Sequence, residues 1–138
     1  MVKAIQFHKP GKPSVLKLEE IALGRPRKGQ IKLRHTAIGL NYIDTYQRSG
    51  LYPLPLPSGL GMEAAGIIEA VGAGVRHLKI GDRVAYGSGA PGAYSEARIM
   101  DAGTVVKIPR GIPDEAAAAM MLKGMTVRYL LQDTYRVK

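Results

Sequence analysis

The chain has 138 residues, of which 46% are hydrophobic and 22% charged, a composition typical of one globular domain. Its apolar stretches are all shorter than the roughly 18 residues that a membrane span requires. Cysteine is absent, which excludes disulfides, thiol catalysis and zinc sites built on thiolates. The N-terminal segment has the pattern of a strand rather than of a signal peptide, so we expect a cytoplasmic protein without membrane contact.

The chain is basic, with 20 lysines and arginines against 11 acidic residues and a net charge of +9. The basic residues are scattered along the sequence. The absence of Trp, with one Phe and seven Tyr, leaves few side chains that could stack on bases. Two interpretations of the charge stay open: a nucleic acid as partner, or a basic face that neutralises a partner domain.

Short apolar or alternating runs, each bounded by Gly or Pro, predict strands along most of the chain. The alternation is strictest over residues 30–38. The 17 Gly and 9 Pro agree with many turns between short strands. The predicted strands are residues 2–8, 15–21, 30–38, 63–71, 82–86, 93–100 and 104–108.

Two segments have the spacing of helices. Residues 42–49 follow an Asn and precede Gly50, which fits a C-terminal stop. A second helix begins at Pro113, and we expect Gly124 to interrupt it before a helical pattern resumes over 125–135. Between the helices, three alternating prolines predict an extended loop over residues 51–61.

Strands and helices are segregated along the sequence, which predicts a mainly β (α+β) fold and argues against a doubly wound sheet. A β-barrel or sandwich capped by helices fits this order. Residues 133–138 carry no helix stop signal, and we expect the chain to continue beyond them.

Familiar catalytic and nucleotide-binding motifs are absent or lack their context. Gly87 to Gly92 match G-x-G-x-x-G, but an alternating strand follows where the dinucleotide fingerprint needs a helix, so we interpret this segment as a hairpin connection. The serines lack a G-x-S-x-G elbow. The three histidines, His8, His35 and His77, stand far apart in the sequence and are expected on strand faces or turns.

The segment from Asn41 to Tyr52 is the richest in chemistry. It places an amide, a carboxylate, a guanidinium and three phenols between a strand end and the proline loop. Phenols stack and hydrogen-bond, and an amide both donates and accepts, so this segment could form the polar wall of a site for a planar ligand. The alternative is an amphipathic helix whose tyrosines bridge the core and solvent.

Several motifs together resemble the quinone oxidoreductases, the zeta-crystallin-like, zinc-free branch of the medium-chain dehydrogenases/reductases. The resemblance extends over nearly the whole chain. It rests on residues 39–44, 48–52, 57–66, 81–86, 92–96, 123–126 and 129–131.

This resemblance implies a GroES-like, partly open β-barrel over residues 1–112, with short helices. Residues 113–138 would form a helical segment that leads toward a nucleotide-binding Rossmann domain absent from this chain. Zinc-dependent relatives have Cys and His where this chain has Asn41 and Met62, so the resemblance implies a site without metal. Glu63 is expected to orient local backbone.

The implied activity is hydride transfer from NADPH to a small quinone, in an enzyme of the EC 1.6.5 type that is a homodimer when full length. The Rossmann domain would hold most of the cofactor, so this chain alone is expected to be inactive. Reduction of activated alkenes by NADPH is the first alternative. A basic RNA-binding module or an inert domain is the second.

The resemblance also assigns roles to individual residues. Arg48 is expected either to border the substrate site or to pair with Asp44 at the i,i+4 spacing. Asp82 and Arg83 are expected to form a structural pair. The expected catalytic residues are Asn41, Tyr46 and Tyr52. The expected cofactor-binding residues are Asn41, Tyr42, Ile43, Asp44, Tyr46, Thr126 and Tyr129.

Overall fold

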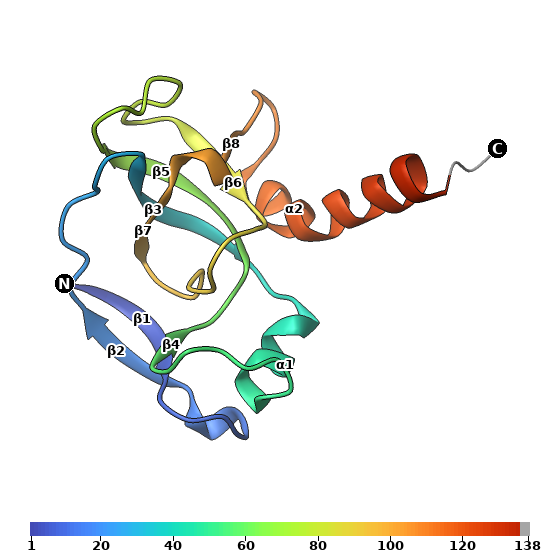
Figure 1. Cartoon of the computed structure of the whole chain (residues 1–138). Coiled ribbons are helices and arrows are strands. Elements are labelled where there is room, and N and C mark those ends of the chain that lie inside the picture. The colour runs from blue at the N-terminus through green and yellow to red at the C-terminus, as the bar shows by residue number, and fades with distance from the viewer. Residues whose placement is uncertain (136–138) are drawn as a thin grey trace.

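The computed structural model describes residues 1–135 and consists of two antiparallel sheets and two main helices (Figure 1). Arg136–Lys138, the end of the segment expected to continue, lie outside the described residues. The strands are β1 (Val2–Phe7), β2 (Lys17–Ile21), β3 (Gln30–Gly39), β4 (Ser58–Gly59), β5 (Glu63–Val71), β6 (Arg83–Tyr86), β7 (Ala97–Asp101) and β8 (Val106–Lys107). The helices are α1 (Tyr42–Ser49) and α2 (Asp114–Arg128), with 3-10 turns at Pro13–Val15 and Ala102–Thr104 and a π-helical turn at Tyr129–Thr134.

The sheets are linked without closing on themselves. Their strand orders are β2-β1-β4 and β7-β3-β5-β6-β8. The segment before β7 joins them, because the Ile5 N–H donates to the Tyr94 carbonyl at 2.7 Å and the Glu96 N–H to the Lys3 carbonyl at 2.9 Å. The mainly β prediction is confirmed, and the barrel is open in residues 1–135.

The core follows from the alternation of β3. Ile31 and Leu33 are fully buried, whereas Lys32 and Arg34 point to the other face of the sheet and both contact Glu69 there. Further fully buried side chains from β5 and β6 complete the core. They are Ile68, Val84 and Tyr86.

The predicted strands after residue 86 differ most from the structure. Residues 93–95 form no strand beyond a single bridge from Ser95 to Ala4, and the Ser95 hydroxyl donates to the Gly92 carbonyl at 2.9 Å, so β7 begins only at Ala97. Because β7 pairs with β3 and not with β6, the hairpin interpretation of Gly87–Gly92 is wrong. No helix follows this glycine motif, which agrees with its rejection as a dinucleotide fingerprint.

The first turn of α2 is fixed to the larger sheet by polar contacts. Arg83 on β6 donates through Nε to Asp114 Oδ1 at 2.8 Å and through Nη2 to the Ile112 carbonyl at 2.7 Å. The hydrogen bond from Thr36, together with the Arg83 guanidinium, holds the pKa of Asp114 below its usual value. The expected Asp82–Arg83 pair is wrong, since Asp82 pairs instead with Lys107 at 2.8 Å.

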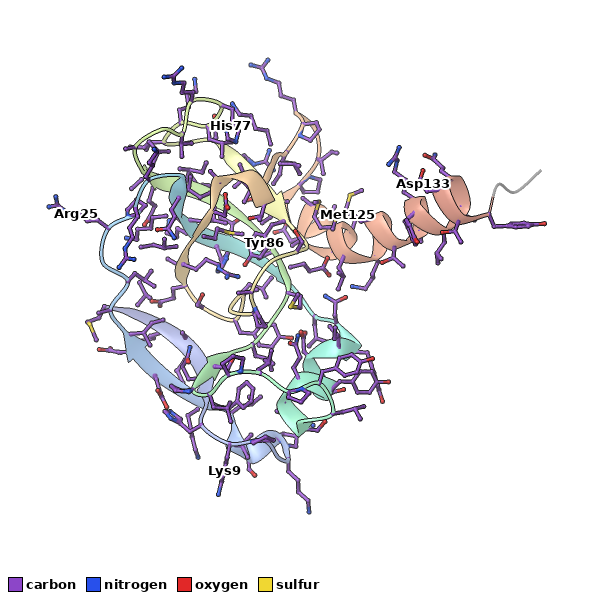
Figure 2. The ribbon with its side chains drawn as sticks, viewed as in Figure 1. Lys9, Arg25, His77, Tyr86, Met125 and Asp133 are labelled. Atoms are coloured by element: carbon purple, nitrogen blue, oxygen red, sulfur yellow. The ribbon has the colours of Figure 1, made fainter. Side chains whose placement is uncertain are left out.

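Helix α2 passes through Gly124 without a break, so the predicted interruption is wrong. One glycine costs a helix interior only about 1 kcal/mol relative to alanine, which neighbouring turns can absorb. Beyond the sheet, the end of α2 and the π-helical turn after it project away from the body, with Met125 in the last turn of α2 and Asp133 in the π-helical turn (Figures 1 and 2). This projecting part exposes several apolar side chains. They are Met125 and Val127 on α2, and Tyr129, Leu130 and Leu131 on the π-helical turn.

The contact between β3 and α2 depends on Gly39 at the end of the strand. A Cβ atom at this position would collide with the Ala118 carbonyl of α2 and with the side chain of Glu63. Gly124 is the opposite case, because nothing lies within 4 Å of the position of its Cβ. The two glycines therefore make a matched pair for substitution.

We expect Gly39→Ala to destabilise the chain by about 1–3 kcal/mol, because the added methyl group pushes α2 away from β3. Gly124→Ala should instead stabilise it by about 0.5–1 kcal/mol, through the better helix propensity of alanine. Urea unfolding of both variants measures the two changes. Equal stabilities of Gly39→Ala and the parent chain would contradict this packing.

Candidate functional site

The N-terminus of α1 is held by a buried carboxylate. Asp44 is 4% exposed, and its Oδ2 accepts the backbone N–H of Asn41 at 3.0 Å and the hydroxyl of Tyr94 at 2.6 Å. Burial, and then the hydrogen bond to Asp44, raise the pKa of Tyr94, so this phenol stays a donor. Gly50, with φ of 88°, ends the helix as predicted.

The side chain of Asn41 turns away from α1 toward β5 and α2. Its Nδ2 donates to Oε1 of Glu63 at 2.8 Å, and its Oδ1 accepts from Nζ of Lys123 at 2.9 Å. The same ammonium contacts Glu63 Oε1 at 3.0 Å, and the other carboxylate oxygen accepts the backbone N–H of Leu122 at 2.7 Å. Glu63 is fully buried, so this carboxylate joins the site to the middle of α2.

Three tyrosines form a connected aromatic group on and after α1. The ring of Tyr46 lies 5.2 Å from that of Tyr42, edge to face, and 5.3 Å from that of Tyr52. Tyr42 is 73% exposed and Tyr52 is 51% exposed. Two of the three phenols therefore face solvent, where they could contact a ligand.

The structure places the remaining predicted site residues as follows. Thr126 on α2 donates its hydroxyl to the Leu122 carbonyl at 2.9 Å, and Tyr129 is exposed on the turn that follows α2. Ile43 is partly buried on α1. Asn41 is thus in contact with α2, whereas Asp44 is buried and bonds to Tyr94.

The expected Asp44–Arg48 ion pair is wrong. The Asp44 carboxylate bonds to the Asn41 N–H and the Tyr94 hydroxyl, whereas Nε of Arg48 is buried with no hydrogen-bond partner in the described part of the chain. The i,i+4 spacing allowed the pair, but the buried Asp44 carboxylate bonds to one local donor, the Asn41 N–H, and one distant donor, the Tyr94 hydroxyl.

Two side chains with clear roles at the site were missed at the sequence level. Lys123 was noted only as part of a motif, and Tyr94 only as part of another. They contact their partners in space but lie far from them in the sequence: Lys123 lies 82 positions from Asn41, and Tyr94 lies 50 positions from Asp44. A single sequence carries no pattern that joins such positions.

A small hollow of about 160 Å³ lies beside α1 and is lined by Asn41, Asp44, Arg48, Leu60 and Tyr94, among others. It borders the predicted residues but is too small for a bicyclic quinone with its cofactor. A site for both the quinone and the cofactor would therefore use the exposed surface of the three tyrosines and of α2 as this chain's contribution.

A larger hollow, of about 490 Å³, lies elsewhere, between β1 and the end of β3. His35 lines it, and the imidazole is held on both sides, by the Ser95 carbonyl at 2.7 Å and the Tyr86 hydroxyl at 2.9 Å. A carbonyl only accepts, so Nδ1 carries the proton and Nε2 accepts from Tyr86. Figure 2 labels Tyr86 in the centre of the molecule. This histidine is therefore part of the buried framework.

The positions where zinc-dependent relatives have Cys and His carry other chemistry in this chain. Asn41 bonds to Glu63 and Lys123, and the Met62 sulfur accepts from Gln47 Nε2 at 3.5 Å. Residues 1–135 contain no group of three or more His, Asp or Glu side chains placed to hold a metal ion. Within the same residues, no helix is both long and apolar enough to cross a membrane.

Residues 27–110 match the family of the alcohol dehydrogenase GroES-like domain. The chain belongs to this family, and the GroES-like fold class is thereby confirmed.

Individual relatives are more specific. The quinone oxidoreductase of Pseudomonas aeruginosa is 52% identical over 139 residues, a match that covers 100% of this chain and 43% of the relative. The crystal structure of Escherichia coli quinone oxidoreductase complexed with NADPH has a TM-score of 0.96 and 52% identity, over 99% of this chain and 42% of that one. A 2-haloacrylate reductase of Burkholderia sp is 43% identical over 145 residues, which cover 100% of this chain and 43% of the reductase. These matches confirm the resemblance to quinone oxidoreductases, and the chain spans less than half the length of each relative.

Burial lowers the pKa of His35 from 6.5 to about 4. Above pH 6.5 the imidazole is neutral in both the folded and the unfolded chain and adds no pH dependence. Between pH 6.5 and 4 only the unfolded chain takes up this proton. The free energy of unfolding should therefore fall as the pH is lowered through this range, by up to about 1.4 kcal/mol per pH unit.

Denaturant unfolding at pH 7 and pH 5 measures this effect, in a range above the lowered pKa values of Asp82 and Asp114. The His35→Gln variant keeps one donor and one acceptor without titrating, so its stability should change less between the two pH values. His8→Gln, at an exposed position, is the control. The same pH dependence in the parent chain and in His35→Gln would contradict the assignment.

Proposed function

We propose that this chain is the N-terminal catalytic part of an NADPH-dependent quinone reductase that transfers hydride without zinc. One observation carries the proposal: the 52% identity to quinone oxidoreductases extends over the whole chain, including the segment from Asn41 to Tyr52. The exposed phenols and the amide of that segment supply the hydrogen-bond donors that a quinone oxygen requires.

The donor set of the site also fits the nicotinamide end of NADPH. Asn41 uses one Nδ2 hydrogen on Glu63, which leaves the second for a carbonyl acceptor such as the carboxamide. Thr126 and Tyr129 are exposed on α2 and the turn after it, free to contact a cofactor there. Asn41, Tyr42, Ile43, Tyr46, Thr126 and Tyr129 are the residues we assign to its binding, with Asp44 acting through the backbone of Asn41.

The apolar second half of α2 suits a domain interface. Its exposed side chains include Met125 and Val127, and Leu130 and Leu131 are exposed on the π-helical turn that follows. An apolar helical surface of this kind suits a covered interface. We propose that this surface packs against a nucleotide-binding domain of the same protein. Residues 1–112 would form the catalytic domain, and the helical segment 113–138 would lead to the nucleotide-binding domain. That domain would hold most of the cofactor, so the isolated chain would be inactive. We also propose that the full-length enzyme is a homodimer.

In the proposed reaction NADPH supplies a hydride, which, with one proton, converts the quinone to a hydroquinone. Tyr46 and Tyr52 donate hydrogen bonds to the quinone oxygens, and Asn41 gives its one remaining Nδ2 hydrogen either to a quinone oxygen or to the carboxamide. Donors on the quinone oxygens stabilise the negative charge that develops there. An already electrophilic quinone needs less polarisation than a ketone or aldehyde, so these donors take the place of a Lewis acid. The proton reaches the reduced oxygen from a tyrosine hydroxyl or from solvent.

Reduction of an activated alkene is the second candidate. It is favoured by the 43% identity to 2-haloacrylate reductase over the whole chain. The same donors would then stabilise the enolate that forms when hydride adds to the alkene carbon.

The full-length protein that carries this chain should oxidise NADPH with a small quinone, and EDTA should not change the rate. Tyr52→Phe should lower kcat about 10-fold, the effect of one lost hydrogen bond in the transition state. Tyr135→Phe, at an exposed position far along the C-terminal segment, is the matched control. Preference for 2-haloacrylate over quinones would favour the second candidate. Alcohol oxidation that EDTA abolishes would contradict both.

A further inference from the structure

Lys123 contacts the side chain most central to the proposed site, yet the proposed reaction assigns it nothing. Its ammonium lies 2.9 Å from Asn41 Oδ1, 3.0 Å from Glu63 Oε1 and 3.4 Å from the Leu40 carbonyl. An ammonium has three hydrogens and no lone pair. All three hydrogens therefore face protein oxygens, so Lys123 lacks a spare one for a substrate in this arrangement.

These contacts determine which way the Asn41 amide faces. Lys123 can only donate, and the ionised Glu63 carboxylate can only accept. Turning the amide over would place its NH₂ against the ammonium and its oxygen against the carboxylate, which opposes both pairs of charges. The observed orientation, with Oδ1 toward Lys123 and Nδ2 toward Glu63, is the one that both neighbours favour.

The orientation has a chemical consequence. Oδ1 lies against the cation and one Nδ2 hydrogen is engaged by Glu63, so the donor that Asn41 has left to offer is the second Nδ2 hydrogen, polarised by the adjacent cation. A carbonyl oxygen is what such a donor recognises. A free amide would present oxygen or nitrogen with nearly equal ease and would lose the entropy of ordering when it binds.

We propose that Lys123 is a positioning residue: with Glu63 it locks the Asn41 amide so that this side chain presents a hydrogen-bond donor to a carbonyl-bearing ligand. For the identity of that ligand the inference rests on the proposed function. Because Lys123 lies on α2 and Asn41 precedes α1, the lock forms only when α2 is docked on β3 and β5. The donor therefore depends on the position of α2.

The orientation itself can be tested on the chain without any activity. In the ¹⁵N-labelled chain, the Asn41 side-chain amide proton that is bound to Glu63 should exchange slowly with water. Lys123→Met should speed this exchange and shift the Asn41 amide signals, whereas Lys123→Arg should retain the slow exchange. Lys107→Met, which removes a surface ion pair to Asp82, is the control and should leave the signals and their exchange unchanged. Asn41 signals identical in the parent chain and Lys123→Met would overturn the proposal.

The full-length protein supplies the kinetic test. Lys123→Met should lower kcat for quinone reduction about 10-fold or more with little change in the KM for NADPH, and Lys123→Arg should stay within about threefold of the parent. An inactive Lys123→Arg would indicate that Lys123 gives up its own proton, and would overturn the positioning role.

A double variant separates orientation of Asn41 from simple neutralisation of Glu63. Lys123→Met leaves a buried carboxylate without its cation, whereas Lys123→Met with Glu63→Gln removes both charges. We expect the double variant to regain thermal stability but not kcat, because nothing in it dictates the direction of the amide. Recovery of kcat together with stability would overturn the proposal. Failure of the parent protein to reduce quinones would contradict the proposed function and leave the amide signals as the test of the lock.

Discussion

The buried carboxylate of Glu63 is the interaction on which the site depends. It begins β5, accepts the Asn41 amide with one oxygen and the Leu122 backbone of α2 with the other, and pairs with Lys123. A fully buried carboxylate is costly unless it is paired and hydrogen-bonded. The three donors meet this requirement only when the strand, the loop before α1 and α2 are assembled, so the fold and the site form together.

The two open sheets supply the frame for this carboxylate. β3 and β5 pair along most of their length, and Gly39 at the end of β3 lets the backbone of α2 come close enough for its N–H to reach Glu63. Arg83 and Asp114 fix the other end of the contact, at the first turn of α2. The part of α2 beyond the sheet has no such contacts in residues 1–135.

Local patterns in the sequence predicted much of the fold and part of the site. The alternation in β3 and the Asn41 and Gly50 boundaries of α1 depend on neighbours a few residues away, and they were predicted correctly. Asp82 and Arg83 were paired because they are adjacent, but adjacent residues of an extended chain point to opposite faces, and each has a distant partner instead. The contacts of Lys123 span 60 and 82 positions, so they depend on tertiary packing that no local pattern encodes.

Hydrogen exchange of a Glu63→Ala variant tests the central role of this carboxylate most directly. Peptides that cover α2 should exchange about 10-fold faster or more than in the parent chain, because the helix loses its hold on the sheet, whereas peptides from β3 should keep their protection. Glu69→Ala, which removes a surface carboxylate from the same strand, is the control and should change neither. Unchanged protection of α2 in Glu63→Ala would contradict the account.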